Sequence, residues 1–245
     1  MVIVMNKLDF FREYNEQIFK VYDELNLKNL SQVEFEGKNS VSYFSEVLRS
    51  KSSIKPLPYS DFKIHDELDF ITKDIKYIIG VLYFLRPHIV DTEFNDGKYL
   101  QNLEDHRYLT YASFGVQAVH NYWDRLGDLL YLFFETGLRE DSVYLSRVLN
   151  NVKPWVKQKE VYQNFKAHYD KFILPFLEER HNIVHHFQLE AKYYWGAIEN
   201  HQNKVGRERL NTEKFGWVEK LTNMLSDSIK GFDLTLKLID ILPDN

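Results

Sequence analysis

The residues best equipped for chemistry gather in one short run, EERHNIVHH, at positions 178–186. This run contains two glutamates, an arginine and three of the chain's nine histidines. Apolar segments lie on both sides of it, KFILPFL before and FQLEAKYYW after. Ionisable groups beside core residues need water or a partner. The run is therefore either a solvated helix face or a site.

A helix face that meets only water is the simplest interpretation, and it suits Glu178 and Glu179 and is open for His186. Arg180 fits it less well. The apolar stripe runs through 165, 169, 172 and 176 and resumes at 183 and 187, so its missing step falls at 179 or 180. A buried structural role for Arg180 and His185 stays open, because polar pairs do occur in helical bundles.

A metal site is a second interpretation. His181 and His185 are four residues apart, a workable spacing for two ligands on one helix face. Glu178 and His181 also form Glu-x-x-His, the unit of di-iron bundles, but such bundles need a second unit and further glutamates. Neither His120 nor His168 has a glutamate three residues before it. We therefore expect no metal and no other cofactor.

The third interpretation is acid–base chemistry without a metal. An imidazole titrates near neutral pH and exchanges protons, whereas a guanidinium stays charged and binds phosphate oxygens in a bidentate way. One of each, close together, suits cleavage of an RNA phosphodiester. The histidine would deprotonate the 2′-OH or protonate the leaving 5′-oxygen, and the arginine would stabilise the negative transition state.

The segment RHNIVH, Arg180 to His185, resembles the signature of the HEPN superfamily. That signature is an arginine, four to six residues and a histidine, often with Asn, Asp or His after the arginine. The resemblance covers six residues and the helical context. It identifies Arg180 and His185 as the catalytic residues, with His181 at the polar position and Asn182 and His186 in support. His186 also fits the looser spacing, so the choice between His185 and His186 stays open.

The resemblance implies an all-α bundle that acts as a metal-independent endoribonuclease. It further implies a homodimer whose two motifs meet in a cleft, RNA as substrate, a toxin or defence role, and an antitoxin or nucleotidyltransferase as partner. A non-catalytic HEPN-like module that binds a nucleotide, RNA or a protein is the alternative. A structural helical protein without a ligand is a third possibility.

Helix geometry constrains the site. Five residues turn an ideal helix by about 500°, so Arg180 and His185 lie roughly 140° apart around its axis. They could still line one cleft that wraps the helix, as a groove between two protomers would. His181 shares a face with His185 and could orient it by a hydrogen bond.

Two other polar groups are weaker candidates. In HNYWDRLGD, His120, Asp124 and Asp128 fall on one helix face and could reach the same cleft, although a polar flank of a core helix is the simpler interpretation. KVGRERL, residues 204–210, is a basic patch in a predicted loop and could hold RNA phosphates, although a solvated loop is the simpler interpretation. No Ser-His-Asp order is visible.

The elements that must position these residues are helices. Apolar residues at helical spacing predict helices over 7–27, 64–85, 104–135 and 213–241, a helical pattern over 157–198 with Pro175 inside it, and short helices over 40–50 (with a serine cap) and 141–149. The residues of 50–60 and 199–212 predict loops. Pro175 either kinks its helix or opens a new one.

Composition agrees with an all-α, up-and-down bundle. The 245 residues are 44% hydrophobic, with few glycines and prolines, no cysteine and a net charge of −5. We expect residues 1–60 to form an N-terminal helical extension and 61–245 the HEPN-like bundle, together one compact unit. No signal peptide and no membrane-length apolar run is recognisable, so we expect a soluble, cytoplasmic protein without a membrane partner.

Overall fold

The computed structural model describes residues 7–56, 61–91, 100–185 and 188–244, with only the backbone described at 7–11, 61–62 and 180–185. Its elements confirm an all-α helical bundle with almost no strand. In chain order they are α1 (Lys7–Glu24), the 3₁₀ turn η1 (Leu30–Gln32), β1 (Glu34–Phe35), β2 (Lys38–Asn39), α2 (Ser40–Ser50), α3 (Asp61–Leu85), the 3₁₀ turn η2 (Arg86–His88), α4 (Leu103–Phe133), the 3₁₀ turn η3 (Glu140–Ser142), α5 (Leu145–Asn151), α6 (Pro154–Lys157), α7 (Glu160–His168), the π-helical turn η4 (Tyr169–Ile173), α8 (Leu174–His185), α9 (Leu189–Glu199), α10 (Lys204–Phe215) and α11 (Trp217–Asp240).

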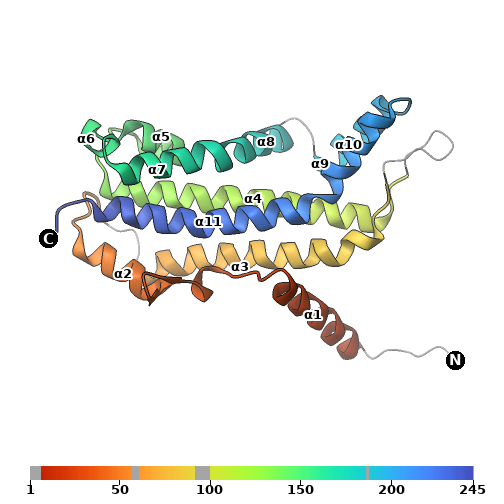
Figure 1. Cartoon of the computed structure of the whole chain (residues 1–245), viewed down its shortest axis with the longest axis horizontal. Coiled ribbons are helices and arrows are strands. Elements are labelled where there is room, and N and C mark those ends of the chain that lie inside the picture. Colours follow the sequence, from red (N-terminus) through yellow and green to blue (C-terminus); the bar gives the residue numbers. More distant parts are fainter. Residues whose placement is uncertain (1–6, 57–60, 92–99, 186–187, 245) are drawn as a thin grey trace.

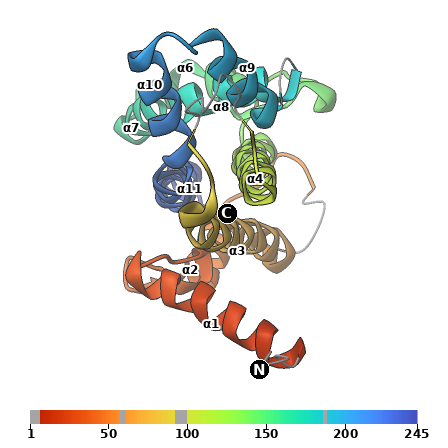
Figure 2. The same cartoon turned by 90° about the vertical axis from the view of Figure 1, so that its right-hand side faces the viewer.

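Three long helices, α3, α4 and α11, pack side by side along the length of the molecule (Figure 1). α4 runs antiparallel to α3, and the segment from α7 to α8 lies on the side of α4 and α11 that faces away from α3, with α7 against α11 and α8 against α4 (Figures 1 and 2). Each long helix presents a buried apolar stripe, as Leu68, Ile75 and Leu82 do on α3. Gly231 lets α11 pack directly against the Trp123 ring of α4, because a Cβ at this position would lie 2.3 Å from the ring.

The N-terminal segment packs on the same core. Phe44 of α2 stacks on Phe232 of α11, with ring centroids 5.7 Å apart. Lys51, just after α2, forms ion pairs with Asp240 at 3.2 Å and Asp244 at 2.6 Å near the other end of the chain. The division into an extension of residues 1–60 and a bundle of 61–245 remains a prediction.

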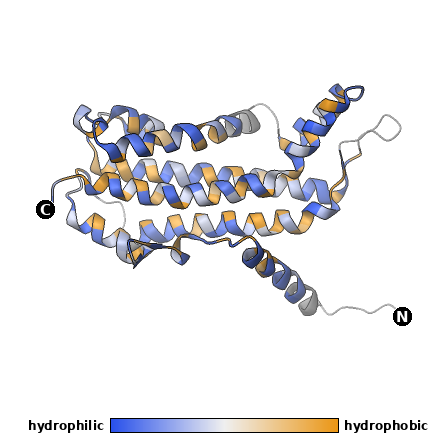
Figure 3. Cartoon of the chain, viewed as in Figure 1, coloured by the Kyte–Doolittle hydropathy of each residue, from blue (hydrophilic) through white to orange (hydrophobic). Residues whose placement is uncertain are grey.

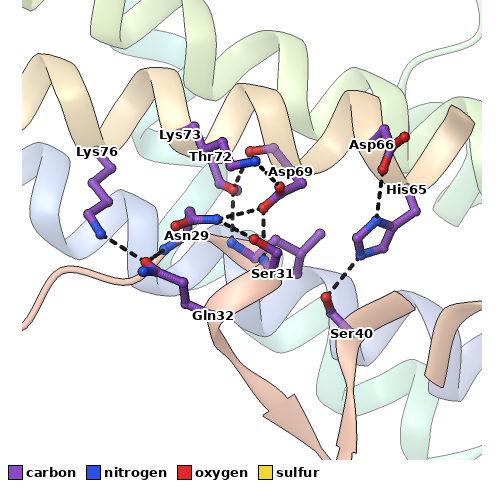
Figure 4. Close-up of polar contacts among 11 residues, drawn as sticks. Asn29, Ser31, Gln32, Ser40, His65, Asp66, Asp69, Thr72, Lys73 and Lys76 are labelled. Carbon is purple, nitrogen blue, oxygen red and sulfur yellow. Dashed lines mark hydrogen bonds and ion pairs between the residues drawn. The ribbon is translucent and has the colours of Figure 1, made fainter. Parts of the chain in front are cut away.

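A polar network joins the turn η1 to α3 (Figure 4). The Asp69 carboxylate accepts hydrogen bonds from the Asn29 side chain and the Ser31 backbone, both at 2.7 Å, and pairs with Lys73 at 2.6 Å. Burial opposes ionisation of Asp69, but these donors outweigh it and hold the pKa of the carboxyl below its usual value. The network fixes an irregular segment whose sequence shows no helical period.

Several predicted boundaries are wrong. Residues 199–212 are largely the helix α10 and not a loop, capped by Asn203, whose side chain accepts from the Gly206 backbone at 3.1 Å. The residue that α10 buries completely is a lysine, Lys214, so apolar periodicity could not reveal the helix. α2 is capped by Asn39 rather than a serine, and the helix expected over 141–149 begins only at Leu145.

The hydropathy of the residues in each helix explains which helices could be predicted from the sequence. Apolar and polar residues alternate along α3, α4 and α11, whereas α10 is mostly hydrophilic (Figure 3). Within the described ranges, no helix combines the length and the apolar character needed to cross a membrane.

Candidate functional site

The Arg-x4-His motif occupies the last two turns of α8. The structure describes the helical backbone of Arg180, His181, Asn182 and His185 but not their side chains, and His186 lies outside the described residues. The site is therefore built from α8 itself and from the described side chains that surround it.

Pro175 decides where α8 begins. Proline has no backbone N–H to donate, so it is tolerated in the first turn of a helix, and it is the second residue of α8. The π-helical turn η4 comes directly before, and the chain continues from α7 through η4 into α8. Pro175 therefore falls in the first turn of α8, as one of the two expectations had it, although the helical backbone runs on from α7 through η4 without a break.

Glu179, which directly precedes the motif, holds α8 against two other helices. Its carboxylate pairs with Lys220 of α11 and lies 3.6 Å from Lys192 of α9. Lys192 in turn pairs with Glu213 of α10. The interpretation of Glu179 as a merely solvated side chain is therefore wrong, since it links three helices around the motif.

Two cavities lie on either side of the motif, and both are lined by α4. The α4–α8 pocket, about 220 Å³, is lined by His120, Asp124, Tyr144, Tyr169, Leu177 and Glu178. The α4–α9 pocket, about 400 Å³, is lined by His106, Leu109, Thr110, Phe114, Leu189 and Glu190, among others. Their α4 residues are separated by six positions, from 114 to 120, or about 9 Å of helix.

The chain itself keeps the motif close to both pockets. Glu178 of the α4–α8 pocket is two residues before Arg180. Gln188, which also lines the α4–α9 pocket, is three residues after His185. Three Cα–Cα steps of 3.8 Å limit the distance between Cα185 and Cα188 to about 11 Å.

The α4–α8 pocket contains acid–base groups. His120 Nδ1 lies 3.1 Å from Asp124 Oδ2, as their spacing on one helix face predicted, and both line a cavity that α8 also lines. Asp128 pairs instead with Arg125 at 2.9 Å. Burial raises the pKa of Tyr169 to about 12, so its hydroxyl stays protonated at neutral pH.

The basic segment KVGRERL, which was predicted to be a loop, is part of α10. Its Arg207 binds backbone carbonyls near the start of this helix. The Arg207 guanidinium donates to the backbone carbonyls of Asn200, at 3.5 Å, and His201. Lys204 lies 3.8 Å from Glu208 one turn later. The prediction that this segment is a loop is therefore wrong, whereas binding of RNA phosphates by its basic residues stays a prediction.

A Ser-His-Asp arrangement does occur in space, although no such order was visible in the sequence. Ser40 Oγ lies 2.9 Å from His65 Nε2, and His65 Nδ1 lies 3.7 Å from Asp66 Oδ1 (Figure 4). Ser40 and His65 are each only 1% exposed, and the rings of Phe44 and Phe232 pack against the imidazole. A substrate cannot reach this serine unless α2 moves, so the triad joins α2 to α3.

Among the side chains that the structure describes, no group of three or more Asp, Glu or His residues is arranged to hold a metal ion. His181, His185 and His186 fall outside that search, so the two-histidine spacing is untested. The residues that sequence reasoning missed are His106, Phe114 and Glu190. Phe114 lies off the apolar stripe of α4, which is the one signal that could have drawn attention to it.

Comparison of the chain with protein-family models, with curated proteins and with solved structures finds no match in any of the three. The candidate site therefore stands on its residues and their geometry.

Proposed function

We propose that the protein is a metal-independent endoribonuclease of the HEPN type. The observation that carries the proposal is the Arg180-x4-His185 motif at the end of a bundle helix, with a cavity lined by α4 on either side of it. RNA is the substrate, and two protomers join their motifs. A toxin or defence role, with an antitoxin or nucleotidyltransferase partner, is part of the same proposal through the resemblance.

The proposed reaction is transfer of the phosphoryl group to the neighbouring hydroxyl. The 2′-oxygen attacks phosphorus, the bond to the 5′-oxygen breaks, and a 2′,3′-cyclic phosphate forms. His185 takes the 2′-OH proton or supplies the proton of the leaving 5′-oxygen. Arg180 stabilises the extra negative charge on the phosphate oxygens. His181 and Asn182 orient these groups, and His186 is the competing acid–base residue.

Cleavage of a single-stranded RNA by the purified protein tests the proposal. We expect slow cleavage in the presence of EDTA, because an imidazole and a guanidinium carry the proposed steps. The products should end in 2′,3′-cyclic phosphate, and DNA of the same sequence should resist. Arg180→Ala and His185→Ala should each lower the rate roughly 100-fold or more.

Arg139→Ala provides a matched control, because Arg139 is exposed directly before η3 and pairs locally with Asp141. Its rate should equal that of the wild type. His186→Ala should cost less than His185→Ala if the four-residue spacing is the active one. Equal cleavage by wild type and His185→Ala would contradict the proposal and favour the alternative, a non-catalytic module that binds a nucleotide, RNA or a protein.

A further inference from the structure

The α4–α9 pocket has a mostly apolar lining. Leu109 and Leu189 are both 1% exposed and belong to the buried core behind it. Phe114 is 58% exposed although it is one of the larger apolar side chains of α4. Its ring is held edge-on by Tyr111, with centroids 6.2 Å apart. An aromatic face supported in this way can stack on a planar ring.

Polar groups occupy the rim of the same pocket. The His106 imidazole donates from Nδ1 to Glu190 Oε2 at 3.0 Å. This hydrogen bond joins residues 84 positions apart and holds the carboxylate in place. The Gln101 side chain donates to the Glu190 backbone carbonyl at 3.5 Å. Thr110 adds a hydroxyl to the lining. The Glu190 carboxylate only accepts hydrogen bonds, and each of its oxygens can accept more than one.

The apolar lining and the polar rim together indicate which part of a nucleotide would bind in this pocket. An apolar wall and a stacking ring suit a base, whereas a carboxylate at the rim repels a phosphate. The carboxylate requires a base edge with N–H donors. Guanine offers two adjacent donors, N1–H and the 2-amino group, which match the two carboxylate oxygens. Uracil offers one N–H between two carbonyl oxygens, and those oxygens would face the carboxylate.

We infer that the α4–α9 pocket is a nucleobase subsite that takes guanine in preference to uracil, with Phe114 stacking on the base and Glu190 reading its edge. The inference rests on the proposed function for its RNA substrate. Gln188 of the pocket lies within three residues of His185, so the sugar and phosphate of a base held there would lie beside the end of α8. Phe114 and Glu190 are then specificity-determining residues.

Two measurements on the full chain test this inference. The first is cleavage of RNAs that differ only in carrying G or U at a single position in a poly-A context. The second is equilibrium binding of GMP and UMP, which does not depend on cleavage. The variants are Phe114→Ala and Glu190→Gln. Their matched controls are Phe70→Ala, since Phe70 is 59% exposed on α3, and Glu208→Gln, since Glu208 is exposed on α10.

We expect the wild type to prefer G over U about 10-fold or more in both measurements. Phe114→Ala should weaken binding of both bases about 10-fold, because stacking does not distinguish them. Glu190→Gln should abolish the preference, since an amide presents a donor as well as an acceptor. The controls should behave as the wild type. Circular dichroism should show unchanged helix content in every variant, because Phe114 and Glu190 are partly exposed.

The outcomes separate the two proposals. Cleavage that needs Arg180 and His185, with wild-type nucleotide binding in Phe114→Ala and an unchanged base preference in Glu190→Gln, would overturn the subsite and leave the ribonuclease. Binding of GMP that these two variants weaken, without cleavage by the wild type, would support the subsite and overturn the ribonuclease. Absence of both cleavage and nucleotide binding would overturn both.

Discussion

At the scale of single residues, Lys214 and Asp105 form an ion pair with fully buried side chains. Lys214 Nζ also donates to the Val90 carbonyl at 2.7 Å, and Asp105 accepts from the Asn102 backbone at 3.0 Å. Lys214→Met would leave a buried carboxylate without its cation, so we expect a loss of about 3–5 kcal/mol in the free energy of unfolding measured with urea. Adding Asp105→Asn should recover part of it. Lys204→Met, at an exposed position of the same helix, should cost less than about 1 kcal/mol, and an equal cost for both lysines would contradict the role of the pair.

At the scale of elements, His65 joins α2 to α3 and makes the junction sensitive to acid. Burial lowers the pKa of His65, so the unfolded chain binds the proton more readily than the folded one. Its contribution to stability is complete above the unfolded pKa of about 6.5 and is lost as pH falls below that value. His65→Gln should therefore reduce the fall in unfolding free energy between pH 7 and pH 5. Ser40→Ala, which keeps the imidazole, should lower stability but retain the pH dependence. A slope in His65→Gln equal to that of the wild type would show that other groups carry the acid sensitivity.

At the scale of the whole molecule, the proposed chemistry requires two copies of the chain. Arg180 and His185 lie roughly 140° apart around α8, so one protomer does not present both to one flat surface. We expect a two-fold dimer at micromolar concentration, measured by light scattering, with both motifs near the interface. Cleavage per chain should fall on dilution as the dimer dissociates. A stable monomer with full activity would contradict a composite site.

The sequence by itself determined the parts of the fold that depend on local periodicity. The helices α3, α4 and α11 bury apolar residues every three or four positions over many turns. Their first and last residues could therefore be predicted to within a few positions. It also singled out the His120–Asp124 pair, because residues four apart on a helix are neighbours whatever the tertiary structure.

Only the tertiary structure decided the rest. The contact of His106 with Glu190 joins residues 84 positions apart, and the burial of Lys214 depends on Asp105 and Val90 from other segments. α10 was missed for the same reason, since the residue it buries completely is charged and is stable there only with its distant partner. A local pattern records which residues prefer to be buried, whereas a pocket or a buried pair is made by side chains that meet only after the helices have packed.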